Sequence, residues 1–399
     1  MKIAIAGAGI GGLAAALTLL DAGFEVQLFE LVDELRPLGV GINVMPHAVG
    51  VLYQLGLCDE LDKSAIRTRA IEYRTRFGHL IQSDPRSVEA GFAHPQYSIH
   101  RGVLQFILLN LVYARAGRHA VATGRGVTGF TQTDEAVHLT LSDGTVCKAS
   151  LLIGADGFRS QVRRCLHPQE APAHYEGTMM WRGANWQNPF ADGRTMFIAG
   201  DHEVKFVCYP IKQENGAALI NWVAEIRQDH PRAAEEADWL REGGRDFIKS
   251  FQTFRMADLD ITSLLENTAQ VTQYPMIDRD PLPWWTQGRV TLLGDAAHPM
   301  YPMGANGASQ AILDAKILAE ALALQPGPEG LQAYESCRRP VTTDVVLANR
   351  QAGPERVLDI AAARVKTVDD RIEDLISAAE LEEVAAHYRR IAGFQKTGG

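Results

Sequence analysis

The sequence has few cysteines and no excess of basic residues. Its five cysteines are scattered and contain no Cys-x-x-Cys pair, which disfavours a disulfide framework or a zinc site and fits a reducing cytoplasm. The 48 Asp and Glu residues outnumber the 39 Lys and Arg residues, giving a formal net charge of −9, whereas nucleic-acid binding normally needs a basic face. We therefore expect a cytoplasmic protein with no metal site and no nucleic-acid partner.

Long apolar runs are also missing. The nearest candidate, Phe106–Ala114, is interrupted by Asn110 and falls short of the ~18 apolar residues that mark a membrane-spanning helix. We expect no membrane association. The 399 residues are 46% hydrophobic, which is enough for a large core and more than one domain.

A nucleotide-binding pattern is present at the N-terminus. A buried strand over Lys2–Ala6 leads into Gly7-x-Gly9-x-x-Gly12, and a second strand ends at Glu30. Gly7 permits the tight turn, Gly9 leaves room for a pyrophosphate, and Gly12 lets the helix pack on the sheet. A carboxylate at the end of the second strand accepts hydrogen bonds from the adenosine ribose. The alternatives are a glycine-rich turn without a ligand and, because the run is Ala-rich, a signal peptide.

Two later segments follow short buried strands. Gly154–Ser160 contains Gly-Ala-Asp-Gly. This pattern indicates either a turn that contacts a ligand or an ordinary turn at the end of a strand. In the second segment Asp295 could accept a hydrogen bond from a ribityl hydroxyl of a flavin, or could cap a helix. The loop Pro302–Ala308 leads into a helix whose amides could face a flavin ring, or it is a simple connector. We interpret His298 as a hydrogen-bonded structural residue rather than a base.

The middle of the chain differs from the rest in its residue composition. It is β-rich and aromatic, with strands expected at Met179–Trp186, Thr195–Ala199, Val204–Ile211 and Ala217–Ile226. We predict an α/β fold: a Rossmann-like domain with an inserted antiparallel β-sheet domain and C-terminal helices. The predicted FAD-binding domain comprises residues 1–75, 98–172 and 271–345, the substrate domain residues 76–97 and 173–270, and the helical segment residues 346–399. Helices are also expected over Val49–Leu61 and Asp229–Phe254.

Together, the three glycine-containing segments resemble a known family, the class A FAD-dependent aromatic hydroxylases. In that family the GxGxxG turn, the GADGxxS turn and the GDAAHxxxP segment occur in this order, and the likeness covers about residues 1–345. Within the family, the stretches Arg36–Asn43, Pro95–Gly102 and Tyr301–Ile312 are similar to those of phenazine hydroxylases. Three positions depart from the family pattern. Many members have glycine at the position of Ala305 and asparagine at that of Ser309, and a related hydroxylase has a histidine base at the position of Asn43.

The resemblance implies noncovalent FAD, with NADH or NADPH and O2 as co-substrates. The oxygen would reach an aromatic or N-heteroaromatic ring, phenazine-like or carboxylated, through a C4a-hydroperoxyflavin. No second GxGxxG exists for a dedicated nicotinamide domain, which fits a nicotinamide that binds only transiently. A monomer or a homodimer is expected. The FAD contacts that it implies are Gly7, Gly9, Gly12, Glu30, Leu31, Arg36, Val40, Arg101, Val127, Asp156, Asp295, Gly307 and Ala308.

Three side chains are candidates for catalysis or substrate binding. Tyr209 or His47 would deprotonate or orient a substrate hydroxyl, and Arg182 would clamp a carboxylate unless it is paired structurally. Alternatively, no protein base is used. Further pocket candidates are Met45, Met179, Trp181, Trp222, Met300 and Met303, each of which could equally be core packing. Met180 and Arg182 share one strand face and Met179 and Trp181 the other, and the pattern leaves open which face meets substrate.

Two other functional classes remain open at this stage. One is a different flavin-dependent oxidoreductase on the same scaffold, such as a halogenase or a reductase. The other is a protein that binds FAD without catalysing a reaction. Substrate-dependent incorporation of oxygen separates a monooxygenase from both.

Overall fold

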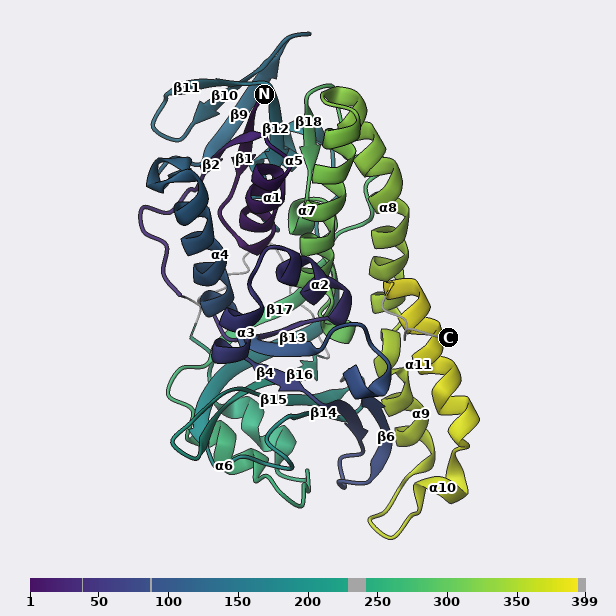
Figure 1. Ribbon diagram of the computed structural model, residues 1–399. Coiled ribbons are helices and arrows are strands. Elements are labelled where there is room, and N and C mark those ends of the chain that lie inside the picture. The colour runs from purple at the N-terminus through teal and green to yellow at the C-terminus, as the bar shows by residue number, and fades with distance from the viewer. Residues whose placement is uncertain (38, 87, 229–241, 394–399) are drawn as a thin grey trace.

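A computed structural model describes residues 1–37, 39–86, 88–228 and 242–393 of the chain. Two large sheets, one parallel and one mostly antiparallel, lie at opposite ends of the molecule (Figure 1). The chain enters the second sheet twice, at residues 70–85 and 174–278, and returns to the first sheet each time. The fold is therefore mixed α/β, as the sequence predicts.

The first sheet is parallel and has the strand order β18-β12-β1-β2-β8. Its strands are short and almost wholly apolar because helices and a small three-stranded sheet of residues 127–149 pack with them into one hydrophobic core. The elements of this layer are β1 (Lys2–Ala6), α1 (Ile10–Asp21), β2 (Glu25–Phe29), α4 (Arg101–Ala116), β8 (Val121–Ala122), β12 (Leu151–Gly154), β18 (Val290–Leu292) and α7 (Gly307–Leu324). The predicted strand–turn–helix–strand opening is confirmed, including the helix that begins at Arg101.

The second sheet has seven strands in the order β17-β13-β16-β15-β14-β5-β6. Every neighbouring pair is antiparallel except β14 with β5. The strands are β5 (Ala70–Arg74), β6 (Leu80–Pro85), β13 (His174–Gln187), β14 (Thr195–Gly200), β15 (Val204–Glu214), β16 (Ala217–Arg227) and β17 (Thr272–Asp278). The four expected strands are all present. The sheet also takes in β5 and β17, which the predicted ranges place in the FAD-binding part, and the domain limits stay a prediction.

Two smaller sheets and several short helices accompany the two large sheets. A three-stranded sheet is formed by β3 (Gly41–Val44), β7 (Gln96–His100) and β4 (Ile66–Thr68), and a second by β9 (Val127–Gln132), β10 (Val137–Leu141) and β11 (Val146–Ala149). The short helices are α2 (Pro46–Gln54), α3 (Cys58–Ser64), α5 (Gln161–Leu166) and α6 (Ile261–Glu266).

Two helix predictions need correction. The helix expected over Val49–Leu61 is in fact α2 and α3, because Gly56 between them adopts a φ of +87° that a helix interior does not allow. Of the helix expected over Asp229–Phe254, residues 229–241 lie outside the described residues. The described remainder forms only a short 3₁₀ helix, Asp246–Phe251, whose phenylalanines pack under the sheet.

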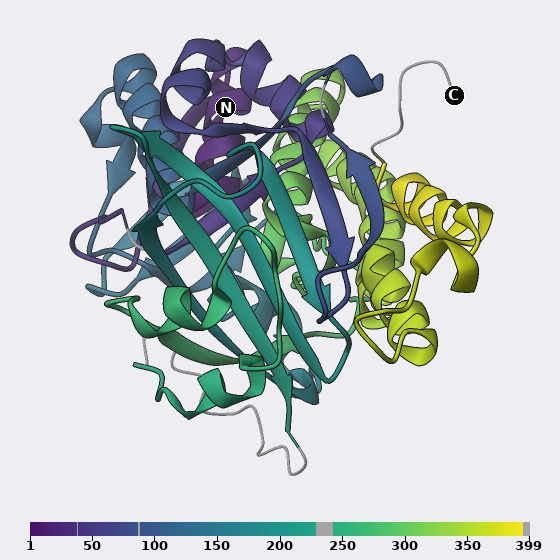
Figure 2. The ribbon, with the colours of Figure 1, turned by 90° about the horizontal axis from the view of Figure 1, so that it is seen from below.

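The C-terminal helices pack along one side of the molecule, as predicted in outline for residues 346–399. They are α8 (Pro328–Arg350), α9 (Arg356–Arg364), α10 (Ile372–Leu375) and α11 (Ala378–Ala392). Helix α8 packs on α7, α11 packs on α8, and α9 contacts β5, β6 and β14 at the edge of the second sheet (Figures 1 and 2). No helix in the described ranges is long and apolar enough to cross a membrane.

Candidate active site

The three glycines of the first turn differ in the space around them. Gly7 has a φ of +96°, and a Cβ on it would lie 2.5 Å from the Ala155 carbonyl oxygen. A Cβ on Gly12 would lie 2.1 Å from the Gly7 carbonyl oxygen, so neither position accepts a side chain. A Cβ on Gly9 would meet no atom of the described residues within 4 Å. The turn thus leaves open space at Gly9, at the N-terminus of α1, which fits a pyrophosphate.

Glu30 is held at the end of β2 by its own turn. One carboxylate oxygen accepts the Ala8 amide at 2.8 Å, and the other accepts the Val32 amide at 3.1 Å. The neighbouring Leu31 is 66% exposed and lies against Gly126, next to Val127, where a Cβ on Gly126 would be 2.8 Å from the Leu31 side chain. The structure therefore brings the carboxylate and an exposed apolar side chain to one place, as an adenosine site requires.

Arg101 and Arg36 behave differently. The Arg101 amide donates to the Val40 carbonyl at 2.9 Å, and its side chain lies beside Gly39. Arg36 instead pairs with Glu34 at 2.7 Å on the surface, where its side chain is 67% exposed. Arg101 and Val40 are therefore placed together, whereas nothing in this arrangement directs Arg36 to the same space.

Asp295 faces the same space as Arg101. The surrounding protein groups reduce the solvation of the Asp295 carboxylate and so raise its pKa, and the charges of His298 and Arg101 act in the opposite direction. Its side chain nevertheless remains open to solvent and forms no hydrogen bond with the described part of the chain. A Cβ on Gly307 would lie 4.0 Å from the Asp295 carboxylate, so the strand end and the first residue of α7 meet. Asp295 does not cap a helix here, and its carboxylate is open to a ligand.

Asp156 has a structural function in the described chain. Its carboxylate accepts the Ser160 hydroxyl at 2.5 Å and the Gln161 amide at 2.7 Å, while Ser160 caps α5 by accepting the Arg163 amide. This is the plain turn that the sequence left open as an alternative. A contact between Asp156 and FAD stays a prediction.

His298 belongs to a buried charge network that the sequence analysis did not include. Its Nε2 lies 2.6 Å from the Asp314 carboxylate. The same carboxylate forms an ion pair with Arg338 at 2.7 Å and accepts a hydrogen bond from the Gly294 amide at 3.0 Å. Burial favours the neutral acid, but His298 and Arg338 lower the pKa of Asp314 to about 2. His298 is therefore structural, as predicted, and it holds the turn that carries Asp295.

The two faces of the second sheet have different partners. Trp181 and Trp222 point to the outer face, where Trp181 stacks on Phe247 with ring centroids 4.9 Å apart. Met180 and Tyr209 lie on the other face, in one apolar cluster with Tyr301 and Met303. The face of Met180 and Arg182 is thus the one turned toward residues 301–303, which precede α7. Trp181, Trp222 and Met179 pack in or against the core on the outer face, so for these three residues the core-packing alternative applies.

Arg182 and Tyr209 form a buried polar group on the inner face. Arg182 donates from one terminal nitrogen to the Tyr274 hydroxyl and from the other to the Gly41 carbonyl, both at 2.8 Å. Burial raises the pKa of Tyr209 to about 12, although Arg182 opposes the shift. Tyr209 is therefore a neutral phenol near pH 7 that can donate or accept a hydrogen bond. Both terminal nitrogens of Arg182 are engaged, which favours structural pairing over a carboxylate clamp.

His47 is a weak candidate for a general base. Burial, together with the positive charges of Arg338 and Arg86, lowers the pKa of His47 to about 3. An imidazole with that pKa is neutral over the whole physiological range and binds a proton poorly.

This environment gives a prediction about acid stability. Because the pKa of His47 is lower in the folded chain than in the unfolded chain, stability is full above about pH 6.5 and falls as the pH drops toward 3. His47→Gln should lose stability less steeply over this window, with an unchanged dependence of turnover on pH above 6.5. Melting temperature measured against pH checks the first part; a variant as acid-sensitive as the parent would contradict it.

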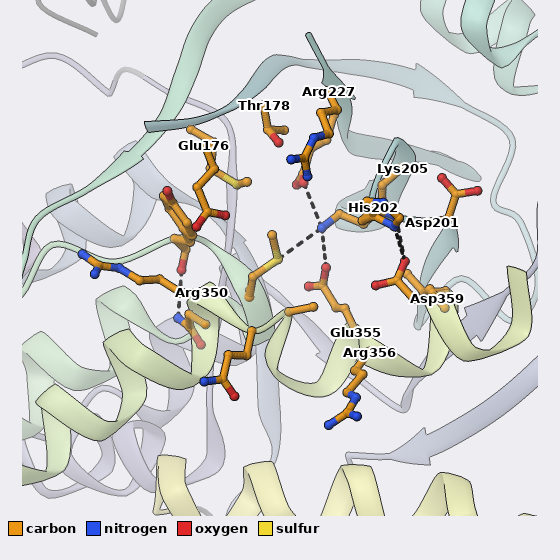
Figure 3. Close-up of a pocket in the computed structure, with 18 of the residues that line it drawn as sticks. Glu176, Thr178, Asp201, His202, Lys205, Arg227, Arg350, Glu355, Arg356 and Asp359 are labelled. Atoms are coloured by element: carbon orange, nitrogen blue, oxygen red, sulfur yellow. Dashed lines mark hydrogen bonds and ion pairs between the residues drawn. The ribbon is translucent and has the colours of Figure 1, made fainter. Parts of the chain in front are cut away.

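A cavity of about 710 Å³ opens beside the inner face, between the sheet and the turn from α8 to α9 (Figure 3). Tyr301 and Met303, from the segment before α7, line it. In Figure 3 Lys205 extends from β15 toward Glu355 on the opposite wall. Lys205 lies between Glu355 and Glu225, 2.8 Å from the latter, and all three are at most 6% exposed. Sequence spacing does not reveal this cavity, because its walls come from residues 176–227, 276, 301–303 and 349–360.

Comparison with known proteins agrees with this geometry. Residues 1–349 match the FAD binding domain family. The chain is 42% identical over 402 residues to the phenazine 1,6-dicarboxylic acid hydroxylase PhzS of Lysobacter antibioticus, covering 98% of this chain and 96% of that protein. It is 32% identical over 385 residues to the 3-amino-4-hydroxybenzoate 2-monooxygenase of Streptomyces cremeus, covering 89% and 87%.

A solved structure supports the same fold. Klebsiella pneumoniae HpxO, crystallised with FAD and uric acid, superposes with a TM-score of 0.73 at 23% identity, covering 98% of this chain and 93% of that one. The family indicated by the three glycine-containing segments is thereby confirmed. The chain belongs to the FAD-binding family of class A aromatic hydroxylases and is an FAD-dependent aromatic monooxygenase.

Proposed function

We propose that the protein hydroxylates a carboxylated N-heteroaromatic compound of the phenazine type, using NADH or NADPH and O2. The observation that carries this proposal is the position of the segment 301–307. Its end at Gly307 meets Asp295, and its start at Tyr301 and Met303 lines the cavity. One segment thus runs from the expected flavin position to the inner face of the second sheet, where Tyr301 and Met303 share an apolar cluster with Tyr209. The high coverage of the phenazine 1,6-dicarboxylic acid hydroxylase supports the substrate class.

The residues that would hold FAD fit both of its ends. Gly9 and Glu30 would hold the pyrophosphate and the adenosine ribose, with Leu31 and Val127 beside the adenine. Asp295 would accept from the ribityl chain, and the amides of Gly307 and Ala308 would face the ring. Bound FAD supplies electron transfer from the nicotinamide and activation of O2; the protein supplies binding, orientation and exclusion of water.

On the substrate side we assign positioning functions to Tyr209 and Arg182. Tyr209 would hydrogen-bond a substrate oxygen as a neutral phenol, since its raised pKa makes it a poor base. Arg182 would fix Tyr274 and β3 beside it rather than bind a carboxylate itself. The seven-stranded sheet would serve as the substrate domain, inserted between parts of the FAD-binding domain, and would exclude water from the ring.

Oxygen labelling tests the proposal. Purified protein should carry FAD and should oxidise NADH or NADPH faster when phenazine-1,6-dicarboxylic acid is added. With isotopically labelled O2, mass spectrometry should find one labelled oxygen atom in the product. A simple benzoate such as 3-hydroxybenzoate serves as the comparison substrate. Reductant oxidation without any labelled product would favour a reductase, and a protein with FAD but no such oxidation would not be an enzyme of this kind.

A further inference from the structure

The loop before α7 is held by residues far along the chain. We call residues 301–306 the flavin-facing loop. Its backbone is unusual, because Gly304 has a φ of +65° and Ala305, which is not a glycine, has a φ of +52°. Such a conformation is unfavourable for alanine and persists only where surrounding contacts impose it. The contacts that could impose it come from the C-terminal helices.

Three residues of the C-terminal segment reach the backbone of this loop. The Asn349 side-chain amide donates to the Tyr301 carbonyl at 2.9 Å. The Tyr388 hydroxyl lies 3.1 Å from the Met303 carbonyl and 2.9 Å from the Asn349 side-chain oxygen. The Gly304 amide donates to Glu355 at 3.3 Å. Consecutive parts of the loop are thus each bonded to a different C-terminal side chain.

The packing leaves the loop little freedom at Tyr388. This side chain is 2% exposed, and a Cβ on Gly304 would lie 2.5 Å from its hydroxyl oxygen. The loop backbone therefore rests directly on the tyrosine. Just beyond the loop, Gln310 in the first turns of α7 donates to the Ala392 carbonyl at the end of α11, at 3.2 Å. Helix α11 contacts the segment on both sides of Gly307.

We propose that Tyr388 is a positioning residue for the flavin ring: through Met303 and Asn349 it fixes the loop, and hence the amides of Gly307 and Ala308. Tyr388 would not touch the cofactor or the substrate itself. Helix α11 lies beyond residue 349, where the match to the FAD binding domain family ends, so this function would be an addition to that domain. The inference rests on the proposed function, because it requires FAD at Gly307.

Tyr388→Phe tests the inference by removing one hydroxyl while keeping the ring against Gly304. We expect FAD to dissociate about threefold to tenfold more readily, as for the loss of one buried hydrogen bond. We also expect a changed flavin absorption spectrum in the substrate-free protein and more hydrogen peroxide per NAD(P)H oxidised. The first two readouts, by titration and visible spectroscopy, do not depend on turnover.

Tyr334→Phe is the matched control. Tyr334 is fully buried in α8, and its hydroxyl donates to the Leu292 carbonyl in β18 at 3.1 Å and bonds no described residue of the flavin-facing loop. Both variants should lower the melting temperature slightly, but only Tyr388→Phe should change the flavin. If Tyr388→Phe equals the parent in FAD affinity and spectrum, or if both variants change them equally, the inference is wrong. Failure of the parent protein to bind FAD would overturn the proposed function instead.

Discussion

Alanine at Gly9 is expected to abolish tight FAD binding without disturbing the fold, whereas alanine at Gly12 is expected to damage the fold itself. Gly9 has an extended backbone, with φ −73° and ψ −179°, that alanine adopts without strain. In the part of the chain that the structure describes, a Cβ there meets no atom within 4 Å, but it would project into the space left for the pyrophosphate. We expect FAD affinity to fall at least about 100-fold, equivalent to roughly 2.7 kcal/mol.

The Gly12 substitution meets the protein instead of the ligand. Its Cβ would lie 2.1 Å from the Gly7 carbonyl oxygen, so α1 would have to move away from β1. Overpacking of this kind costs about 1–3 kcal/mol, here in the centre of the larger core. The FAD-free protein should therefore melt at a lower temperature for Gly12→Ala and at an unchanged temperature for Gly9→Ala. Calorimetry without FAD and a fluorescence titration with FAD measure the two effects separately, and the reverse pattern would refute the pyrophosphate assignment.

The parts of the site that could be predicted are those with a local cause. Glycines at fixed spacing dictate the first turn, and a carboxylate at a strand end is placed by the strand before it. The positions of Gly9, Glu30 and Asp295 in the fold could therefore be predicted from the sequence, while their contacts with FAD stay a prediction. The two sheets and most strands follow from apolar patterning for the same reason. Gly56 shows the limit: one residue with a positive φ divides a helix whose apolar spacing continues through it.

The remaining parts of the site depend on contacts between residues that are far apart in the sequence. Asp314 and Arg338 resemble ordinary surface charges on helices, and nothing local shows that they meet at His298 in the core. Tyr388 contacts a loop 85 residues earlier in the chain. The inner and outer faces of the second sheet are both apolar, because helices or loops cover each, and alternation alone cannot say which one faces the flavin. Such residues become visible only when the fold places them.

The buried trio of Lys205, Glu225 and Glu355 predicts a large loss of stability when the lysine is removed. Lys205→Met would leave two carboxylates facing the cavity without the cation between them. Removing one partner of a buried ion pair costs about 3–5 kcal/mol, because the remaining charge is uncompensated. We expect a loss of this size in the free energy of unfolding, measured by urea denaturation near pH 8.

The loss in the free energy of unfolding of Lys205→Met should be smaller at low pH than at high pH. Burial raises the pKa of Glu355, and Lys205 restrains that rise, so the pKa should increase further in the variant. A carboxyl whose pKa is higher in the folded than in the unfolded chain stabilises at low pH and loses that contribution as the pH rises. The deficit of Lys205→Met should therefore shrink as the pH is lowered from 8 to about 5.5, and Lys205→Met combined with Glu355→Gln should recover part of it.

Lys212→Met on the same strand supplies the comparison. Lys212 pairs with Glu214 at 2.7 Å, but both side chains are about half exposed, so this pair contributes at most about 1 kcal/mol. Its removal should change the free energy of unfolding little and equally at both pH values. If Lys205→Met behaves like Lys212→Met, the carboxylates of the trio are solvated or protonated in the native protein. In that case Glu355 would also be a poor anchor for the Gly304 amide.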